Sequence, residues 1–126
     1  MKDWIPFEEA TYLVEQAFLV AEDNSAALME QTIINVYTGR GGKKSLSGTG
    51  LIQNILLVEL LDDNDDLDLI LDLGGEFKYR LKTPVISAGK VFSPDVKSSI
   101  QFSPTSPWHQ IPEPEFDELF NQLKFL

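Results

Sequence analysis

Hydrophobic residues recur at helical spacing through the first third of the chain. In residues 7–21 the apolar positions are Phe7, Ala10, Val14, Ala17, Phe18 and Ala21. This spacing predicts an amphipathic helix, and the acids Glu8 and Glu9 suit its first turn. After a break at residues 23–25, a second helix is predicted to end at Gly39. Its buried residues would be Met29, Ile33, Val36 and Tyr37.

A segment rich in glycine and serine follows, from Gly39 to Gly50. We expect a mobile loop here, because the segment is too polar to pack. Its start has a superficial likeness to a phosphate-binding loop. The spacing fails, Lys44 stands where a hydroxyl residue is needed, and the loop follows a predicted helix, so we expect no nucleotide site.

The middle of the chain alternates between apolar and polar residues, the period that indicates strands. Segments 67–73 and 76–82 flank Gly74-Gly75 and predict a β-hairpin. We favour a three-residue loop over a two-residue loop, because it places Leu71 opposite Phe77 or Tyr79. Asp68 and Asp72 then lie beside Lys or Arg on the outer face.

Shorter segments complete the predicted elements. Residues 54–61 are predicted to form a buried strand, with a short helix as the alternative. Residues 85–86, 90–92 and 100–102 predict further strands, whereas the prolines of residues 103–114 predict irregular structure. Near the end of the chain, an apolar stripe predicts an amphipathic helix that docks on its own sheet. The stripe consists of Phe116, Leu119, Phe120 and Leu123.

Together these elements predict one α+β domain over residues 1–126. It has two N-terminal helices, a central and mostly antiparallel sheet, and one C-terminal amphipathic helix. The sheet would be a meander of about four to five strands, an ordinary size for a sheet. A chain of 126 residues is long enough to bury a single core.

The net charge of the chain limits the kinds of molecule that it is expected to bind. Twenty Asp and Glu against ten Lys and Arg give a net charge of −10. Phosphates are repelled by such a chain, which argues against nucleic acid and anionic membranes and favours a basic protein. The chain has no cysteine, which excludes disulfides and thiolate chemistry and favours the cytoplasm. We expect no secretory signal and no membrane span, because the apolar stretches are too short.

The densest run of acids is the candidate docking patch for such a partner. It consists of Asp62, Asp63, Asp65 and Asp66. No base is adjacent to them in sequence, and a solvated turn is the alternative interpretation. A calcium loop is not expected, since Leu67 stands where glycine is needed and Leu73 where a bidentate glutamate is needed.

Trp108, Glu113 and Glu115 complete the predicted partner-binding set. Aromatic residues often anchor interfaces, although core packing is the more frequent place for a tryptophan such as Trp108. The single histidine, His109, is expected to be exposed. No nucleophile motif accompanies it, so we expect no catalytic residue, no metal and no cofactor.

The sequence favours a small cytoplasmic protein-binding module, a monomer or weak dimer. Our preferred hypothesis is an immunity-type inhibitor that neutralises a basic, nuclease-type toxin by covering its active groove. Acidic residues would speed the encounter of the two proteins. The alternatives are a structural or adaptor subunit of a larger assembly and a small carboxylate-dependent enzyme.

Overall fold

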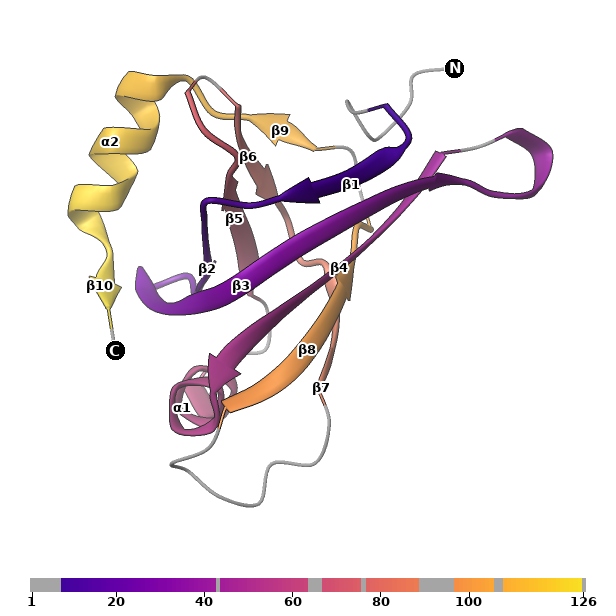
Figure 1. The fold of residues 1–126 in the computed structure, drawn as a ribbon. Helices are drawn as coiled ribbons and strands as arrows, with labels where there is room; N and C mark the ends of the chain where they lie inside the picture. Colours follow the sequence, from indigo (N-terminus) through magenta and orange to yellow (C-terminus); the bar gives the residue numbers. More distant parts are fainter. Residues whose placement is uncertain are drawn as a thin grey trace.

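The structure is a computed structural model, which describes residues 8–42, 44–63, 67–75, 77–88, 97–105 and 108–125, except for the side chains at 40, 57, 61–63 and 88. In chain order the elements are β1 (Ala10–Leu13), β2 (Gln16–Val20), β3 (Ser25–Thr38), the 3-10 turn η1 (Arg40–Gly42), β4 (Lys44–Gln53), α1 (Asn54–Asp63), β5 (Asp68–Asp72), β6 (Lys78–Leu81), β7 (Val85–Ala88), β8 (Lys97–Ser103), β9 (His109–Gln110), α2 (Glu113–Gln122) and β10 (Lys124–Phe125) (Figure 1). Strands therefore dominate, and the predicted α+β class is wrong.

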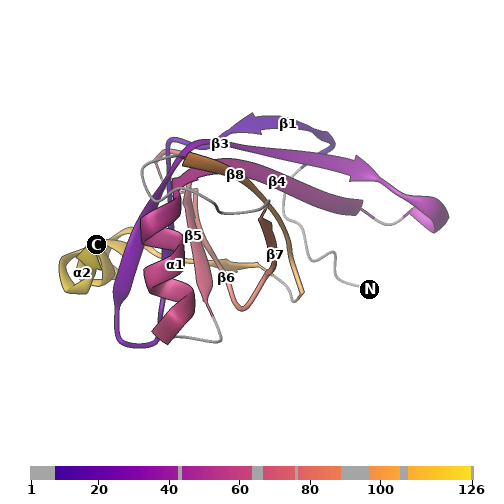
Figure 2. The ribbon, with the colours of Figure 1, turned by 90° about the horizontal axis from the view of Figure 1, so that it is seen from below.

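The sheet is curled about the long strand β3. Eight strands follow the order β7-β8-β4-β3-β2-β5-β6-β9, and β1 and β10 each pair with β3. We call β2, β5, β6 and β9, with the first part of β3, the β5 half. The β4 half consists of β1, β4, β8 and β7 with the second part of β3. Figure 2 shows the two halves curling toward each other, with α1 inside the curl and α2 outside it. The main hydrophobic core lies between their inner faces.

The predicted N-terminal helices are wrong, because residues 10–38 form β1, β2 and β3. Strand β2 is buried on both faces from Ala17 to Val20, so its apolar residues are consecutive and mimic part of a helical stripe. Strand β3 contains Thr32, Ile33, Ile34 and Val36, and such β-branched residues favour strands.

The break at residues 23–25 is a hairpin turn and not a helix cap. Asn24 adopts a left-handed φ of 69°, a conformation that asparagine tolerates better than most residues. The Asp23 carboxylate accepts a hydrogen bond of 3.0 Å from the Ser25 backbone N–H. This side-chain contact fixes the turn between β2 and β3.

The predicted mobile loop at Gly39–Gly50 is also wrong, because most of it belongs to strand β4. Residues 46, 48, 50 and 52 face the inner core and are buried. A Cβ on Gly48 would lie 2.0 Å from the Phe102 ring, and one on Gly50 would lie 2.2 Å from the sulfur of Met29. The glycines thus leave room for two large side chains of neighbouring strands.

Residues 54–63 form α1, so the helix alternative is confirmed and the favoured strand was wrong. Leu56 and Leu60, four residues apart, pack against the inner core. Ile55 and Val58 are 45% and 41% exposed, so the segment is apolar on more than the face it buries. A continuous apolar run of this length has no period that separates helix from strand.

The predicted hairpin is confirmed as β5–β6, with Leu71 opposite Tyr79. The Leu73 N–H donates to the Phe77 carbonyl over 2.9 Å, which leaves the predicted three-residue loop between them. The predicted pairs on the outer face are confirmed as well: Asp68 with Arg80 at 2.6 Å and Asp72 with Lys78 at 3.7 Å.

Strands β7 and β8 confirm the predictions at residues 85–86 and 100–102. The prediction at residues 90–92 lies outside the described residues. The prediction of irregular structure at residues 103–114 is wrong in part, because Ser103 ends β8, residues 109–110 form the short β9, and α2 begins at Glu113.

The C-terminal helix is confirmed as α2 and packs on the outer face of the β5 half. Phe18 of β2 lies at the centre of this contact, with the rings of Phe116, Phe120 and Phe125 within 5.8–6.3 Å of its own. Burial of Phe116, which is 5% exposed, contributes about 2 kcal/mol. The helix is therefore held on its own chain, as the apolar stripe predicted.

No helix within the described residues is long and apolar enough to cross a membrane.

Candidate functional site

Helix α2 presents an acidic outer face. Its four acids are all exposed: Glu113, Glu115, Asp117 and Glu118. The helix contains no Lys or Arg, and none of the ion pairs seen between described residues includes these four carboxylates. Because Phe116 fixes the opposite side of the helix to the sheet, the acids are held on a rigid element. The predicted partner residues Glu113 and Glu115 belong to this face, which we call the α2 face.

A groove of about 320 Å³ runs beside the α2 face. Glu115 and Glu118 line it from the helix, and Arg80 and His109 line it from β6 and β9, where they are paired in register. Asp68 already pairs with the Arg80 guanidinium, at 2.6 Å. His109 is exposed, as predicted, so the groove brings together solvated groups.

The other predicted partner residues lie elsewhere. Trp108 is 9% exposed and packs in the inner core with its ring 5.7 Å from that of Tyr79, in the core position that was the alternative prediction. Asp62 and Asp63 end α1, but their side chains lie outside the described part of the chain. Asp65 and Asp66 lie outside it entirely, so the docking patch at residues 62–66 stays a prediction.

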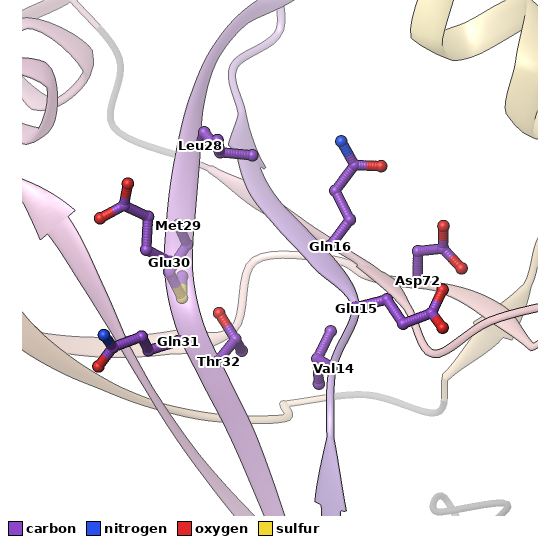
Figure 3. A pocket seen from close by; sticks show the side chains of 9 residues that line it. All are labelled: Val14, Glu15, Gln16, Leu28, Met29, Glu30, Gln31, Thr32 and Asp72. Atoms are coloured by element: carbon purple, nitrogen blue, oxygen red, sulfur yellow. The ribbon is translucent and has the colours of Figure 1, made fainter.

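A second concave site lies where β1 meets β2, and we call it the corner recess (Figure 3). Its volume is about 450 Å³. The pairs Leu13 with Ile33 and Ala17 with Met29 follow one register, so β1 and β2 are one interrupted strand beside β3. The recess is lined by Val14, Glu15, Gln16, Leu28, Met29, Glu30, Gln31, Thr32 and Asp72.

A β-bulge in β3 shapes this recess. Glu30 pairs with Leu51 and Ile33 with Thr49, so two residues of β3 oppose the single Gly50 of β4. Within the bulge Gln31 has a φ of 50°, a left-handed conformation that costs a residue other than glycine on the order of 1 kcal/mol. Such bulges bend a strand and redirect its side chains. Here the bulge marks the point where the sheet turns from its β5 half to its β4 half.

Two carboxylates meet at one side of the recess. The backbone N–H of Gly74 donates to Asp72 over 2.9 Å, and a Cβ on Gly74 would lie 3.3 Å from the Glu15 carboxylate. Lys78 pairs with Asp72 at 3.7 Å, and Lys97 pairs with Glu30. Glu15 has no ion pair within the described residues. The recess therefore keeps a negative charge that no described base neutralises.

The recess also contains a buried hydroxyl without a partner. Thr32 is 4% exposed, and its hydroxyl oxygen makes no hydrogen bond within the described part of the chain. The oxygen lies toward strand β4, because a Cβ on Gly50 would be 3.0 Å from it, and Figure 3 shows it beside β3, on the side of Met29. A buried polar group without a partner is uncommon in folded proteins and calls for an explanation.

The described side chains contain no group of three or more His, Asp or Glu that could hold a metal ion. What both sites offer is hydrogen-bond acceptors and negative charge, which suits binding of a cation.

No pattern in the sequence indicated the corner recess. Residues 14–16 and 28–32 were placed in two predicted helices, and Asp72 in a strand remote from both. The only local signal was the β-branched run that begins at Thr32, which would have indicated strand β3 but not its bulge.

Comparison of the chain with models of known protein families, with curated proteins and with solved structures gives no significant match.

Proposed function

We propose that this protein is a protein-binding module that receives a basic partner on the α2 face. The observation that carries the proposal is the set of four exposed carboxylates on a helix that has no base and is fixed in place by buried aromatic rings. Charges on such a rigid element need no reordering when the partner arrives, so binding loses little conformational entropy.

The net charge of the chain should also raise the rate at which a basic partner associates. A net charge of −10 attracts a basic protein over a distance of about 8–10 Å, the screening length at ordinary ionic strength. Such attraction raises association rates by roughly 10- to 1000-fold. The acids Asp62, Asp63, Asp65 and Asp66 extend this proposal as a second contact region.

Within this class we favour an immunity-type inhibitor that covers the active groove of a basic, nuclease-type toxin. Its four acids would occupy the toxin surface that normally binds phosphates. We propose the cytoplasm as its location, since small secreted domains are usually held by disulfides and this chain has no cysteine. In this proposal the protein is no enzyme, and it needs no cofactor.

The test neutralises the α2 face and compares it with an equal change elsewhere. The variant carries Glu113→Gln, Glu115→Gln, Asp117→Asn and Glu118→Gln. The control variant carries Gln in place of the exposed glutamates 8, 9, 22 and 59. Both have a net charge of −10 + 4 = −6.

Each tagged protein is used to capture partners from a lysate of the source cell, and association rates with the captured partner are then measured. We expect a basic protein that survives about 0.5 M salt, where the screening length is roughly 4–5 Å. The α2 variant should associate with it far more slowly than the control variant does. Equal rates for the two variants, or an absence of any basic partner, would refute the proposal.

A structural or adaptor role is the second candidate, and the outer face of the β4 half favours it. One row of side chains, paired in register across five strands, contains no charged residue: Leu13, Ile33, Thr49, Gln101 and Ser87. Leu13 is 78% exposed, and an exposed apolar side chain in an uncharged row suits contact with a neighbouring subunit. Capture that is insensitive to salt and to the α2 variant would favour this role.

A further inference from the structure

We infer that a second copy of this chain pairs with the outer edge of strand β1, so that two copies associate through one continuous sheet. This edge consists of the peptide groups of Thr11 and Leu13 that point away from β3, and we call it the β1 edge. The contact goes beyond the proposed function, because it uses neither the α2 face nor a basic partner. Figures 1 and 2 both place β1 away from α2.

The hydrogen bonds between β1 and β3 determine which peptide groups point outward. The Val14 N–H donates to the Thr32 carbonyl over 3.0 Å. In an antiparallel pair, residues that bond to the neighbouring strand alternate with residues whose peptide groups point away from it. Tyr12 therefore bonds to β3, whereas the N–H and C=O groups of Thr11 and Leu13 point to the opposite side.

Within the described chain, no strand pairs with that opposite side of β1. Strand β5 takes the same side of β2, where the Glu15 N–H donates to the Asp72 carbonyl over 2.9 Å. Asp72 is the last residue of β5, and the chain then turns at Gly74 toward β6. Thr11 and Leu13 are exposed, Leu13 to 78%, so a strand from outside can reach the β1 edge.

Strand β1 also lacks the features that usually protect the edge of a sheet. Natural edges carry charged residues, prolines or bulges that discourage pairing with another chain. The sequence of β1 is Ala10-Thr11-Tyr12-Leu13, without a charge or a proline, and its register with β3 has no shift. At the other edge of the β4 half, β7 directly follows Pro84, which has no N–H to donate. The β1 edge is therefore the better site for pairing.

The β1 edge is complementary to itself. When two copies lie antiparallel with Tyr12 at the twofold axis, Thr11 of one copy lies opposite Leu13 of the other. Each copy then donates two N–H groups and offers two carbonyls, which gives four hydrogen bonds across the axis. The Leu13 side chain also gains a cross-strand neighbour, the Thr11 side chain of the other copy.

The absence of charge at this surface favours a second copy over a basic partner. Two copies with a net charge of −10 each repel one another, so they approach most easily where neither presents a charge. Strand β1 is uncharged, and so is the row that continues from Leu13 across the β4 half. The acids Glu9 and Glu15 flank β1 in sequence. Salt screens their repulsion and should therefore strengthen the pairing.

The first experiment measures the association of the intact protein by sedimentation equilibrium. At about 0.5 M salt we expect a dimer with a Kd of about 0.1–1 mM, because a contact of this size is weak. Leu13→Glu should weaken association at least tenfold, since it places two like charges beside the axis. The matched control is Val85→Glu, which changes an exposed apolar residue of β7 and should weaken association less than about twofold. Both variants have a net charge of −10 − 1 = −11.

Amide hydrogen exchange then shows whether the contact is a pairing of strands. In the monomer the amides of Thr11 and Leu13 have no acceptor in a neighbouring strand, so they should exchange rapidly. At protein concentrations well above the Kd they should exchange at least about fivefold more slowly. The Tyr12 amide bonds to β3 in both states and is the internal control.

A monomer at about 1 mM protein and 0.5 M salt would overturn the inference. Equal weakening by Leu13→Glu and Val85→Glu would overturn it too, as would a dimer in which Thr11 and Leu13 exchange as fast as in the monomer. Slower exchange confined to residues 85–88 would assign the contact to β7 instead. Leu13→Glu should stay folded, because the side chain that it replaces is 78% exposed.

The proposed function fails or stands separately. The α2 variant should form the dimer as well as the native protein does, because the α2 face takes no part in it. A dimer with protected Thr11 and Leu13, without any captured basic partner, refutes only the proposed function. A captured partner that itself protects these two amides, in a chain that forms no dimer, would assign the β1 edge to that partner and overturn the inference.

Discussion

Thr32→Val should stabilise the protein, even though Thr32 lines a candidate binding site. The hydroxyl is buried and makes no hydrogen bond within the described chain, and a buried polar group left in this state costs about 1–3 kcal/mol. Valine has nearly the same shape and replaces the hydroxyl by a methyl group. It also suits a strand, because it is β-branched.

We therefore expect the free energy of unfolding to rise by about 1–2 kcal/mol. A chain of 126 residues unfolds with an entropy of roughly 0.26 kcal/mol/K, so the melting temperature should rise by about 4–8 °C. Urea unfolding followed by circular dichroism measures the change, provided that the slope with denaturant is the same in both proteins.

Thr49→Val is the matched control. Thr49 lies on the neighbouring strand β4, opposite Ile33, and is exposed, so its hydroxyl is hydrated. We expect a change within about 0.5 kcal/mol for this variant. A loss of stability in Thr32→Val, or equal changes in the two variants, would show that the Thr32 hydroxyl is already satisfied.

Two further predictions test the fold. Gly48→Ala places a Cβ 2.0 Å from the Phe102 ring and should lower the free energy of unfolding in urea by about 3 kcal/mol. The control Ser47→Ala, on the exposed face of β4, should lower it by less than about 0.5 kcal/mol. Equal losses for the two variants would mean that β4 is not packed as described. The backbone N–H of Ser25 lowers the pKa of Asp23 below its ordinary value of 3.8, with smaller contributions from the Ser25 side chain and from Lys124. The stability that this carboxylate adds is present above the unfolded pKa and is lost as the pH falls through the lower, folded pKa. The advantage of the native protein over Asp23→Asn in urea unfolding should therefore be steady at neutral pH and shrink as the pH falls below about 4. An advantage that did not shrink there would contradict the assignment.

Local patterns predicted the elements whose partners are close in sequence. The register of β5–β6 followed from matching faces across a short loop, because a shift by one residue would turn every side chain to the opposite face. Helix α2 followed from its apolar stripe, since one side of the helix is solvated and the period of its hydrophobic residues survives. For the same reason the exposure of Glu113 and Glu115 on that helix could be expected from the sequence.

The N-terminal strands could not be predicted in this way. Strand β2 is covered on its inner face by the core and on its outer face by α2, a partner about a hundred residues away in sequence, so no alternation remains. The glycines of β4 look like loop residues until Phe102 and Met29 are seen to occupy the space beside them. Each of these errors came from a distant side chain that the local pattern does not contain.

The sequence by itself determined the acidity of the protein, the hairpin at Gly74-Gly75 and the amphipathic C-terminal helix, because these depend on residues near one another in the chain. Only the tertiary structure decided the curl of the sheet, the position of Trp108 in the core and the corner recess. The recess combines residues 14–16, 28–32 and 72, and a bulge in β3 brings them together. A bulge is set by how two strands pair, so its effect on Thr32 and Glu15 appears only once the sheet has formed.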